Sequence, residues 1–206
     1  MVTCHLGGGC TVAAIKGGQA IDTTATFGTC GGIPMGTRAG DVDSGVLLHL
    51  LEQCGYSVAD LRDLLYRQSG LLGVSGISAD MRDIAKAAEA NNPRAHLARN
   101  MFAYAIRKII GAFAAALEGL DAIVFTAGIG ENDSGLRALV CAPLAWMGVH
   151  LDEEGNESRG RETVISAENS PVKVLVIPTN EELMIAREAA TLVGYSKPEG
   201  ARGIEE

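Results

Sequence analysis

Thr3-Cys-His-Leu-Gly-Gly-Gly-Cys-Thr-Val-Ala-Ala-Ile-Lys-Gly-Gly-Gln-Ala-Ile-Asp22 is the stretch that decides the fold, because the glycines at 7–9 separate two apolar, strand-like runs. A turn without side chains lets backbone N–H groups converge on an anion such as phosphate. The second run ends in Lys16-Gly17-Gly18, which is typical of a hairpin. The stretch therefore predicts either a phosphate-binding turn or a tight structural hairpin, and both interpretations stay open.

The length and composition are typical of one globular domain with a sizeable core, or of one such domain and a small additional unit. The chain has 206 residues, of which 47% are hydrophobic and 20% are charged. Its net charge of −8 provides no basic surface for nucleic acid or for an anionic membrane. The longest apolar run, 109–117, is far shorter than the roughly 20 residues of a membrane span, and we recognise no signal peptide. We therefore expect neither a nucleic-acid partner nor a membrane partner.

The cysteines predict the redox compartment. Their number is odd, and none form a Cys-x-x-Cys pair: they are Cys4, Cys10, Cys30, Cys54 and Cys141. This pattern is typical of free, buried thiols in a reducing cytoplasm rather than of a disulfide framework.

Hydrophobic periodicity predicts alternating strands and helices. The clearest helix spans 94–120, where Ile106, Ile110 and Phe113 follow the spacing of a buried stripe. We also expect short strands within 2–27, loops over 28–44 and 69–83, helices over 44–55, 58–67, 134–144 and 181–193, buried strands over 121–125 and 172–177, and a frayed tail over 195–206. This order predicts an α/β fold with helices on a mixed sheet, in which ligands bind at the carboxyl ends of strands.

The segment Thr126-Ala-Gly-Ile-Gly-Glu-Asn132 follows one of the buried strands. Its two glycines would let a flat base or a ribose approach the backbone, and the start of the next helix favours negative charge. It is not a dinucleotide fingerprint, because the third glycine of that pattern is absent. An ordinary strand–turn–helix connection fits the same residues.

Other polar residues also have both an ordinary and a functional interpretation. Arg38 lies in a Gly-rich loop, where an arginine is usually solvated, but its guanidinium fork suits a phosphoryl group in transfer. Asp80 and Arg82 either begin a helix or contact a nucleotide. Glu181 is either an acidic residue of a first helical turn or a ligand of Mg²⁺.

Taken together and in this order, the motifs resemble those of the acetate kinase family, within the superfamily of actin, Hsp70 and sugar kinases. The resemblance covers nearly all of residues 2–193. It rests on five blocks: His5-Leu-Gly-Gly-Gly9, Met35-Gly-Thr-Arg-Ala-Gly-Asp-Val-Asp43, Ser69-Gly-Leu-Leu-Gly-Val-Ser-Gly-Ile-Ser-Ala-Asp-Met-Arg-Asp83, Ile123-Val-Phe-Thr-Ala-Gly-Ile-Gly-Glu-Asn132 and Val174-Leu-Val-Ile-Pro-Thr-Asn-Glu-Glu182.

The resemblance implies a ribonuclease H-like lobe of an actin-like ATPase, a mixed β-sheet flanked by helices. Residues 1–194 would form the C-terminal nucleotide-binding lobe, followed by a flexible tail over 195–206. The implied reaction is transfer of the γ-phosphoryl group of ATP to a short-chain carboxylate, acetate giving acetyl phosphate, with ATP or ADP and Mg²⁺ as cofactors. A cytoplasmic homodimer joined through this lobe is also implied.

The resemblance also implies the role of each site residue. Arg38 would be catalytic and stabilise the phosphoryl group in transfer, and Glu181 would position Mg²⁺. The phosphates would be cradled by His5, Leu6, Gly7, Gly8 and Gly9. The adenosine pocket would be lined by Asp80, Met81, Arg82, Gly128, Ile129, Gly130, Glu131 and Asn132.

Two departures from the family pattern limit these implications. The family usually has Asn where this chain has Gly8, so a side-chain donor is lost while the backbone N–H groups remain. Family members are longer, and nothing in this chain matches their N-terminal lobe, which carries most of the acid-binding pocket. We therefore expect nucleotide binding but little or no turnover without that lobe, and whether a separately encoded chain supplies it stays open. The alternatives are a non-catalytic dimeric nucleotide-binding module and a fragment of a propionate kinase.

Overall fold

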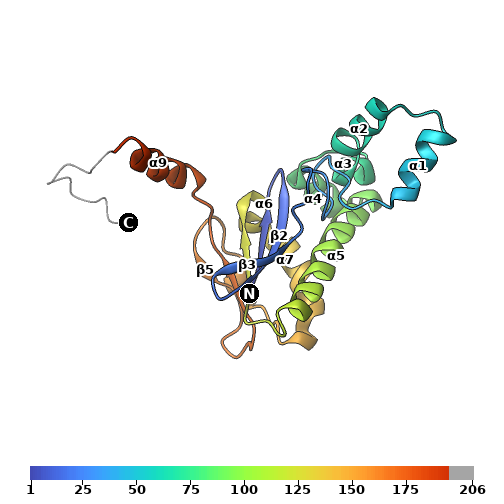
Figure 1. The fold of residues 1–206 in the computed structure, drawn as a ribbon. Helices are drawn as coiled ribbons and strands as arrows, with labels where there is room; N and C mark the ends of the chain where they lie inside the picture. Colours follow the sequence, from blue (N-terminus) through green and yellow to red (C-terminus); the bar gives the residue numbers. More distant parts are fainter. Residues whose placement is uncertain (195–206) are drawn as a thin grey trace.

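A six-stranded mixed sheet organises the computed structural model, which describes residues 1–194 (Figure 1). The strand order is β3-β2-β1-β4-β6-β5. The central strands β1, β4 and β6 are parallel, whereas β2, β3 and β5 each run antiparallel to a neighbour. The strands are β1 (Val2–Leu6), β2 (Cys10–Lys16), β3 (Gln19–Thr23), β4 (Ala122–Thr126), β5 (Thr163–Val164) and β6 (Lys173–Val176).

The first two strands form the hairpin that the opening stretch predicts. Their register pairs Val2 with Ala14 and Leu6 with Cys10, so the three glycines make up the whole connection. Successive side chains alternate between the two faces of a strand. Val2 and Leu6 are fully buried on one face, while His5 is only half-buried on the other. The hairpin is therefore a structural turn, and it also places the His5 side chain on the more exposed face of the sheet.

The buried face of the sheet packs against the long helix α5, which contacts β1 and β2 and also α3, α4 and α7. Asn92 caps its N-terminus by accepting from the N–H groups of Arg94 and Ala95. The predicted stripe of this helix is buried, with Ile106 and Ile110 fully inaccessible. The helices are α1 (Ser44–Glu52), α2 (Val58–Arg67), α3 (Gly70–Ser75), α4 (Met81–Glu89), α5 (Pro93–Ala116), α6 (Ala127–Asn132), α7 (Ser134–Cys141), the 3₁₀ helix η1 (Ala142–Met147), α8 (Glu153–Asn156) and α9 (Glu181–Leu192).

Several predicted segments differ in the structure. The helices expected over 44–55 and 94–120 end earlier, at Glu52 and Ala116. The stretch 69–83 is not a loop: it contains α3 and the start of α4, and backbone contacts to another segment hold α3, since Leu71 donates to the carbonyl of Met35 at 2.8 Å. The Gly turn at 126–132 is the short helix α6. The helix expected to end at 144 stops at Cys141, because Pro143 tightens the next turn into η1. The expected tail, 195–206, lies outside the described residues.

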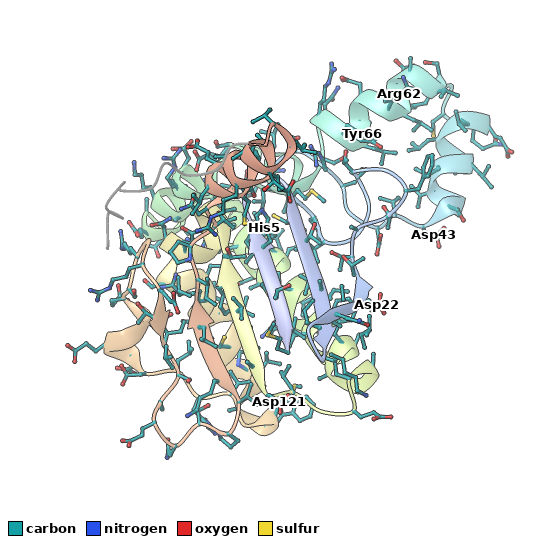
Figure 2. The ribbon with its side chains drawn as sticks, turned by 60° about the vertical axis from the view of Figure 1, so that its left-hand side comes forward. His5, Asp22, Asp43, Arg62, Tyr66 and Asp121 are labelled. Carbon is teal, nitrogen blue, oxygen red and sulfur yellow. The ribbon has the colours of Figure 1, made fainter. Side chains whose placement is uncertain are left out.

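Two helical segments stand apart from the sheet (Figure 1). The arm formed by α1 and α2 extends to one side, where Figure 2 labels Asp43, Arg62 and Tyr66. Helix α9 follows β6, and neither α1 nor α9 contains a buried residue. No helix within residues 1–194 combines the length and the apolarity needed to cross a bilayer.

All five cysteines are free thiols, as the sequence predicts. Their predicted burial holds for Cys4, Cys10 and Cys141, whereas Cys30 is half-buried and Cys54 is exposed. Burial is the main cause that raises the pKa of each of the three buried thiols, so these groups are protonated and unreactive at neutral pH.

Candidate functional site

The carboxyl ends of the three parallel strands meet at one edge of the sheet. The glycine turn 7–9 follows β1, α6 follows β4, and the segment 177–180 leads from β6 into α9. Figure 2 shows His5 near this edge, beneath α9, and Asp121 at the opposite end of the sheet. Loops at this edge are where ligands bind in such sheets, so the topology alone selects this region.

Three hollows adjoin at this edge, and Gly8 is the one residue that borders all of them within the described chain. The first hollow, of about 980 Å³, lies between α4, α5 and α6. The second, of about 330 Å³, lies beside Arg38. The third, of about 490 Å³, lies beside His5 and Glu181. The glycine turn is therefore the junction of one branched site.

The turn itself offers fewer N–H groups than the sequence suggests. The N–H of Gly7 donates to the carbonyl of Gly9 at 3.0 Å, so it is already used. The N–H groups of Gly8 and Gly9 make no hydrogen bond within residues 1–194. A Cβ atom built on Gly8 would meet no atom within 4 Å, so the fold does not require glycine there. Leu6 is fully buried and borders none of the three hollows.

The first hollow brings together most of the residues predicted to contact adenosine. Asp80 caps α4 by accepting from the N–H of Arg82 at 2.8 Å, and its carboxylate also forms an ion pair with the Arg82 guanidinium at 2.6 Å. These hydrogen bonds lower the pKa of Asp80 to about 2, so the carboxylate is ionised at neutral pH. The predicted residues that line this hollow are Gly7, Gly8, Asp80, Met81, Arg82, Gly128, Ile129 and Asn132.

Two predicted residues of α6 have other contacts. Gly130 is buried against the sheet, where a Cβ atom would lie 3.4 Å from the carbonyl carbon of Phe125. The Glu131 carboxylate reaches the segment after β6 and accepts from the N–H of Thr179 at 3.0 Å. Ala127, the first residue of α6, has a φ of +64°, an unfavourable conformation for a residue with a Cβ atom. Within residues 1–194 two other residues with a Cβ atom, Asn91 and Glu118, also have a positive φ, so this strain is local and not particular to the site.

The sequence did not single out several charged groups that line the same hollow. Arg99 of α5 forms an ion pair at 2.9 Å with Asp133, the N-cap of α7, and both side chains are largely buried. Lys86 and Arg159 border the hollow as well. Asp133 has the sequence signal of an N-cap before a helix, whereas the other three become neighbours of the hollow only through packing.

One fully buried arginine, Arg137, ties this region together. Its guanidinium donates to the carbonyls of Gly130 and Ser158, both at 2.8 Å, and to the side-chain oxygen of Asn156 at 3.0 Å; it also donates to the Asn156 carbonyl. Burial lowers the pKa of Arg137, although an arginine remains charged at neutral pH. The network joins α6 to the segment that carries Arg159.

The second hollow contains the predicted catalytic arginine. Arg38 donates from Nη1 to the carbonyl of Thr29 at 3.1 Å, and the same atom would lie 3.6 Å from a Cβ atom on Gly9. The guanidinium therefore lies against the glycine turn. Cys10 shares this hollow, but burial raises the pKa of its thiol to about 11, so it is no nucleophile at neutral pH.

The third hollow pairs a histidine with carboxylates. His5 Nε2 lies 4.0 Å from Glu181 Oε1, and the Glu181 side chain is 72% exposed. Within residues 1–194 no cluster of three or more His, Cys, Asp or Glu side chains would hold a metal ion by itself. One or two carboxylates beside a phosphate site are nevertheless the usual protein ligands of Mg²⁺, which takes its other ligands from phosphates and water. Glu181 and Glu182 fit that role.

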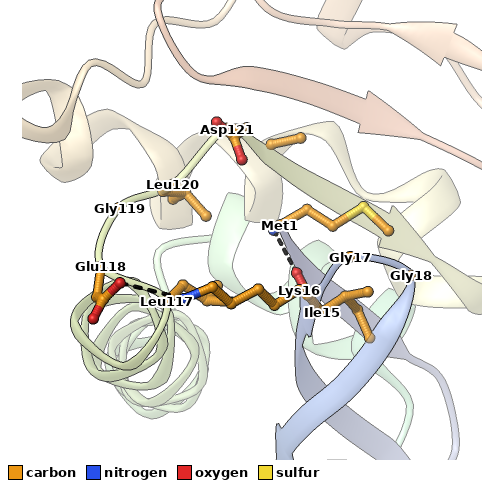
Figure 3. A pocket seen from close by; sticks show the side chains of 11 residues that line it. Met1, Ile15, Lys16, Gly17, Gly18, Leu117, Glu118, Gly119, Leu120 and Asp121 are labelled. Carbon is orange, nitrogen blue, oxygen red and sulfur yellow. Dashed lines mark hydrogen bonds and ion pairs between the residues drawn. The ribbon is translucent and has the colours of Figure 1, made fainter.

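A fourth hollow, of about 490 Å³, lies at the opposite end of the sheet (Figure 3). Its polar groups already pair with each other, because the N-terminal ammonium donates to the Ile15 carbonyl at 2.9 Å and Lys16 pairs with Glu118 at 3.3 Å. None of the predicted site residues borders it. We therefore place the functional site at the carboxyl edge.

The chain is similar to known kinases of carboxylic acids. It is 51% identical over 193 residues to the acetate kinase of Carboxydothermus hydrogenoformans, a match that covers 94% of this chain and 48% of the relative. The crystal structure of Porphyromonas gingivalis acetate kinase superposes with a TM-score of 0.89 and 46% identity, over 93% of this chain and 48% of that one. The crystal structure of a propionate kinase from Francisella tularensis superposes with a TM-score of 0.85 and 37% identity. That match covers 91% of this chain and 48% of the propionate kinase.

The chain thus spans about half the length of the curated relatives it matches. Acetate kinases have the actin-like ATPase fold, so the mixed sheet with its helices is identified as part of that fold, as the sequence predicts. The model of the Acetokinase family matches residues 1–187. The chain therefore belongs to the acetokinase family.

Proposed function

We propose that residues 1–194 form the C-terminal, nucleotide-binding lobe of a kinase that transfers the γ-phosphoryl group of ATP to a short-chain carboxylate. The junction of three hollows at Gly8 carries this proposal. A nucleoside in the first hollow would extend its phosphates past the unpaired N–H groups of Gly8 and Gly9 toward Arg38. A carboxylate acceptor beside Arg38 would then lie in line with the terminal phosphate.

In this arrangement we assign a separate role to the arginine, to the phosphate-binding groups and to the carboxylates. Arg38 would bind the equatorial oxygens of the phosphoryl group in transfer, since phosphoryl transfer depends on alignment and charge neutralisation. His5 and the two free N–H groups would hold the phosphate chain. Glu181, aided by Glu182, would hold Mg²⁺, which neutralises phosphate charge when bound.

We further propose that turnover requires a second lobe that covers this edge, either in one polypeptide or as a separate chain. Glu181 and His5 are open to solvent, with side-chain exposures of 72% and 39%. Phosphoryl transfer to a weak carboxylate nucleophile competes with transfer to water, so an open site would hydrolyse ATP rather than phosphorylate the acid.

The five free thiols are consistent with a protein that functions in the reducing cytoplasm. Relatives include acetate and propionate kinases, so the proposal covers the class of short-chain acids.

The direct test is calorimetric titration with ADP and ATP in the presence of Mg²⁺. We expect the wild-type chain to bind both with dissociation constants below about 1 mM, the usual range for substrates. Gly128→Leu should weaken binding at least ten-fold, because Gly128 borders the first and third hollows and a side chain there would fill them without a clash at Cβ.

The matched control is Gly111→Leu. Gly111 is also a helical glycine with open space at Cβ, but it borders none of the three hollows, so nucleotide affinity should not change. Absence of nucleotide binding to the wild-type chain at millimolar concentration would refute the proposal. Equal weakening by both variants would show that Gly128 acts through the fold and not through the site.

We also propose that two copies associate through the α1–α2 arm. Helix α1 contains Val46, Leu47, Leu48, Leu50 and Leu51, yet none of its residues is buried. A nine-residue helix is only marginally stable in water by itself, and an exposed apolar surface of this kind marks an interaction site. We therefore expect another protein surface to bury these side chains. A second copy provides a matching apolar surface. A dimeric module that binds nucleotide without turnover is the second candidate function, and the same surface favours it.

Sedimentation equilibrium tests the dimer. We expect a mass of twice the 21.4 kDa chain without nucleotide, and a monomer for Leu48→Glu, because Leu48 is 55% exposed on α1. Val164→Glu places the same charge at a residue that is 56% exposed on β5 and should leave the dimer intact. A wild-type monomer, or a dimer that survives Leu48→Glu, would contradict the proposed interface.

A further inference from the structure

Glu131 lies at the site without bordering any of its three hollows. Its half-buried side chain extends from α6 across to the segment that follows β6. There Oε1 accepts two hydrogen bonds from one residue, from the N–H of Thr179 at 3.0 Å and from its hydroxyl at 3.4 Å. These are the only side-chain hydrogen bonds within residues 1–194 that join α6 to this segment.

Little else fixes the segment and the helix after it. The last backbone contact to the sheet is the N–H of Ile177, which donates to the Phe125 carbonyl at 3.0 Å. Beyond it, α9 has no buried residue, and Figure 1 shows it standing apart from the sheet. The approach of His5 to Glu181, at 4.0 Å, is longer than a hydrogen bond.

Thr179 is therefore the last residue before α9 that hydrogen-bonds to α6. It precedes Glu181 by two residues, a reach of about 7 Å along an extended chain. A shift of the segment would move the Glu181 carboxylate by a similar distance. A shift of that size would take the carboxylate out of reach of a bound Mg²⁺ and leave it in solvent. The N–H of Leu183 donates to the side-chain oxygen of Asn180, the N-cap; this bond orders the helix internally but does not attach it to the sheet.

We infer that Glu131 is a positioning residue: by holding Thr179, it places Glu181 beside the glycine turn, and it does not contact the nucleotide. The metal-binding consequence rests on the proposed function, whereas the positioning itself does not. Glu131 thereby links the α6 side of the site, where the nucleoside would lie, to the carboxylate side, where Mg²⁺ would lie.

Hydrogen exchange measured by mass spectrometry on the full chain without ligand tests the positioning. Glu131→Ala should speed exchange in peptides that cover 177–185 by about ten-fold or more, because a charged acceptor is lost from an otherwise unanchored segment. Glu131→Gln keeps an oxygen that accepts both bonds and should stay within about three-fold of the wild type. Glu118→Ala, which removes an exposed carboxylate at the opposite end of the sheet, should change nothing in these peptides.

Titration with ADP separates positioning from nucleotide contact. Glu131→Ala should leave the affinity for metal-free ADP within about two-fold and remove most of the gain in affinity that Mg²⁺ gives the wild type. Wild-type exchange rates over 177–185 in Glu131→Ala would overturn the inference. So would an equal loss of affinity with and without Mg²⁺, which would make Glu131 a nucleotide ligand. If the wild type binds no nucleotide while the exchange result stands, the proposed function fails and the positioning role survives.

Discussion

Replacement of Arg137 by methionine is expected to lower the free energy of unfolding by about 4 kcal/mol. Methionine fills much of the same volume but donates no hydrogen bond, so the carbonyls of Gly130, Asn156 and Ser158 would stay buried without a partner. Each orphaned buried acceptor costs about 1–3 kcal/mol, and removal of one member of a buried charged network typically costs 3–5 kcal/mol.

Urea unfolding followed by circular dichroism measures this effect. Arg137→Lys should recover only part of the loss, because an ammonium cannot reproduce the planar fork that serves several acceptors at once. Arg67→Met is the control: its side chain is 81% exposed and makes one ion pair with Asp63, so the change should not exceed about 0.5 kcal/mol. A loss below 1 kcal/mol for Arg137→Met would show that the network contributes little to stability.

Arg38→Ala is expected to reduce acetyl phosphate formation by a factor of 10² to 10³, with nucleotide affinity changed less than about three-fold. Removal of a preorganised donor to a developing negative charge costs about this much. The assay needs a complete site. We would combine the chain with the part of the Carboxydothermus hydrogenoformans acetate kinase that it does not match, and trap acetyl phosphate with hydroxylamine.

The control for Arg38 is Arg62→Ala, which removes an arginine from α2, on the arm outside the three hollows. Turnover should then be unchanged. If Arg38→Ala lowers turnover and ADP affinity by the same factor, Arg38 holds the nucleotide or the loop and does not act on the phosphoryl group. If the combined chains form no acetyl phosphate, the dimeric nucleotide-binding module becomes the better description of this protein.

The hairpin at 3–22 was predictable because its residues contact each other over a short distance in sequence. The same holds for α5, whose stripe at Ile106 and Ile110 repeats with the helical period. Helices α3 and α6 were missed because they are too short for a period to emerge. Their hydrogen bonds and packing depend on distant segments such as the one around Met35.

The site likewise contains residues that the sequence predicted and residues that only the packing of distant segments brings together. The family motifs predicted Arg38, Asp80 and Glu181 as residues of one site, although only Glu181 follows a parallel strand: Arg38 follows the hairpin strand β3, and Asp80 follows α3. They did not distinguish Gly128, which borders two hollows, from Gly130 two residues later, which packs on Phe125. Nor did they reveal Arg99, whose partner Asp133 lies 34 residues away, or Arg137, whose partners include Asn156, 19 residues away.

The parallel core of the sheet also determines when the site can exist. Its walls come from 7–9, from α6 and from 177–182, and β1 pairs with β4 over a separation of about 120 residues, from Val2 to Ile123. Such distant pairings form late in folding, because the loop between them must close first. A chain emerging from the ribosome cannot assemble all three walls until nearly its full described length has been made. Nucleotide binding would therefore report on completed folding, and a saturating ligand would protect the finished lobe from unfolding.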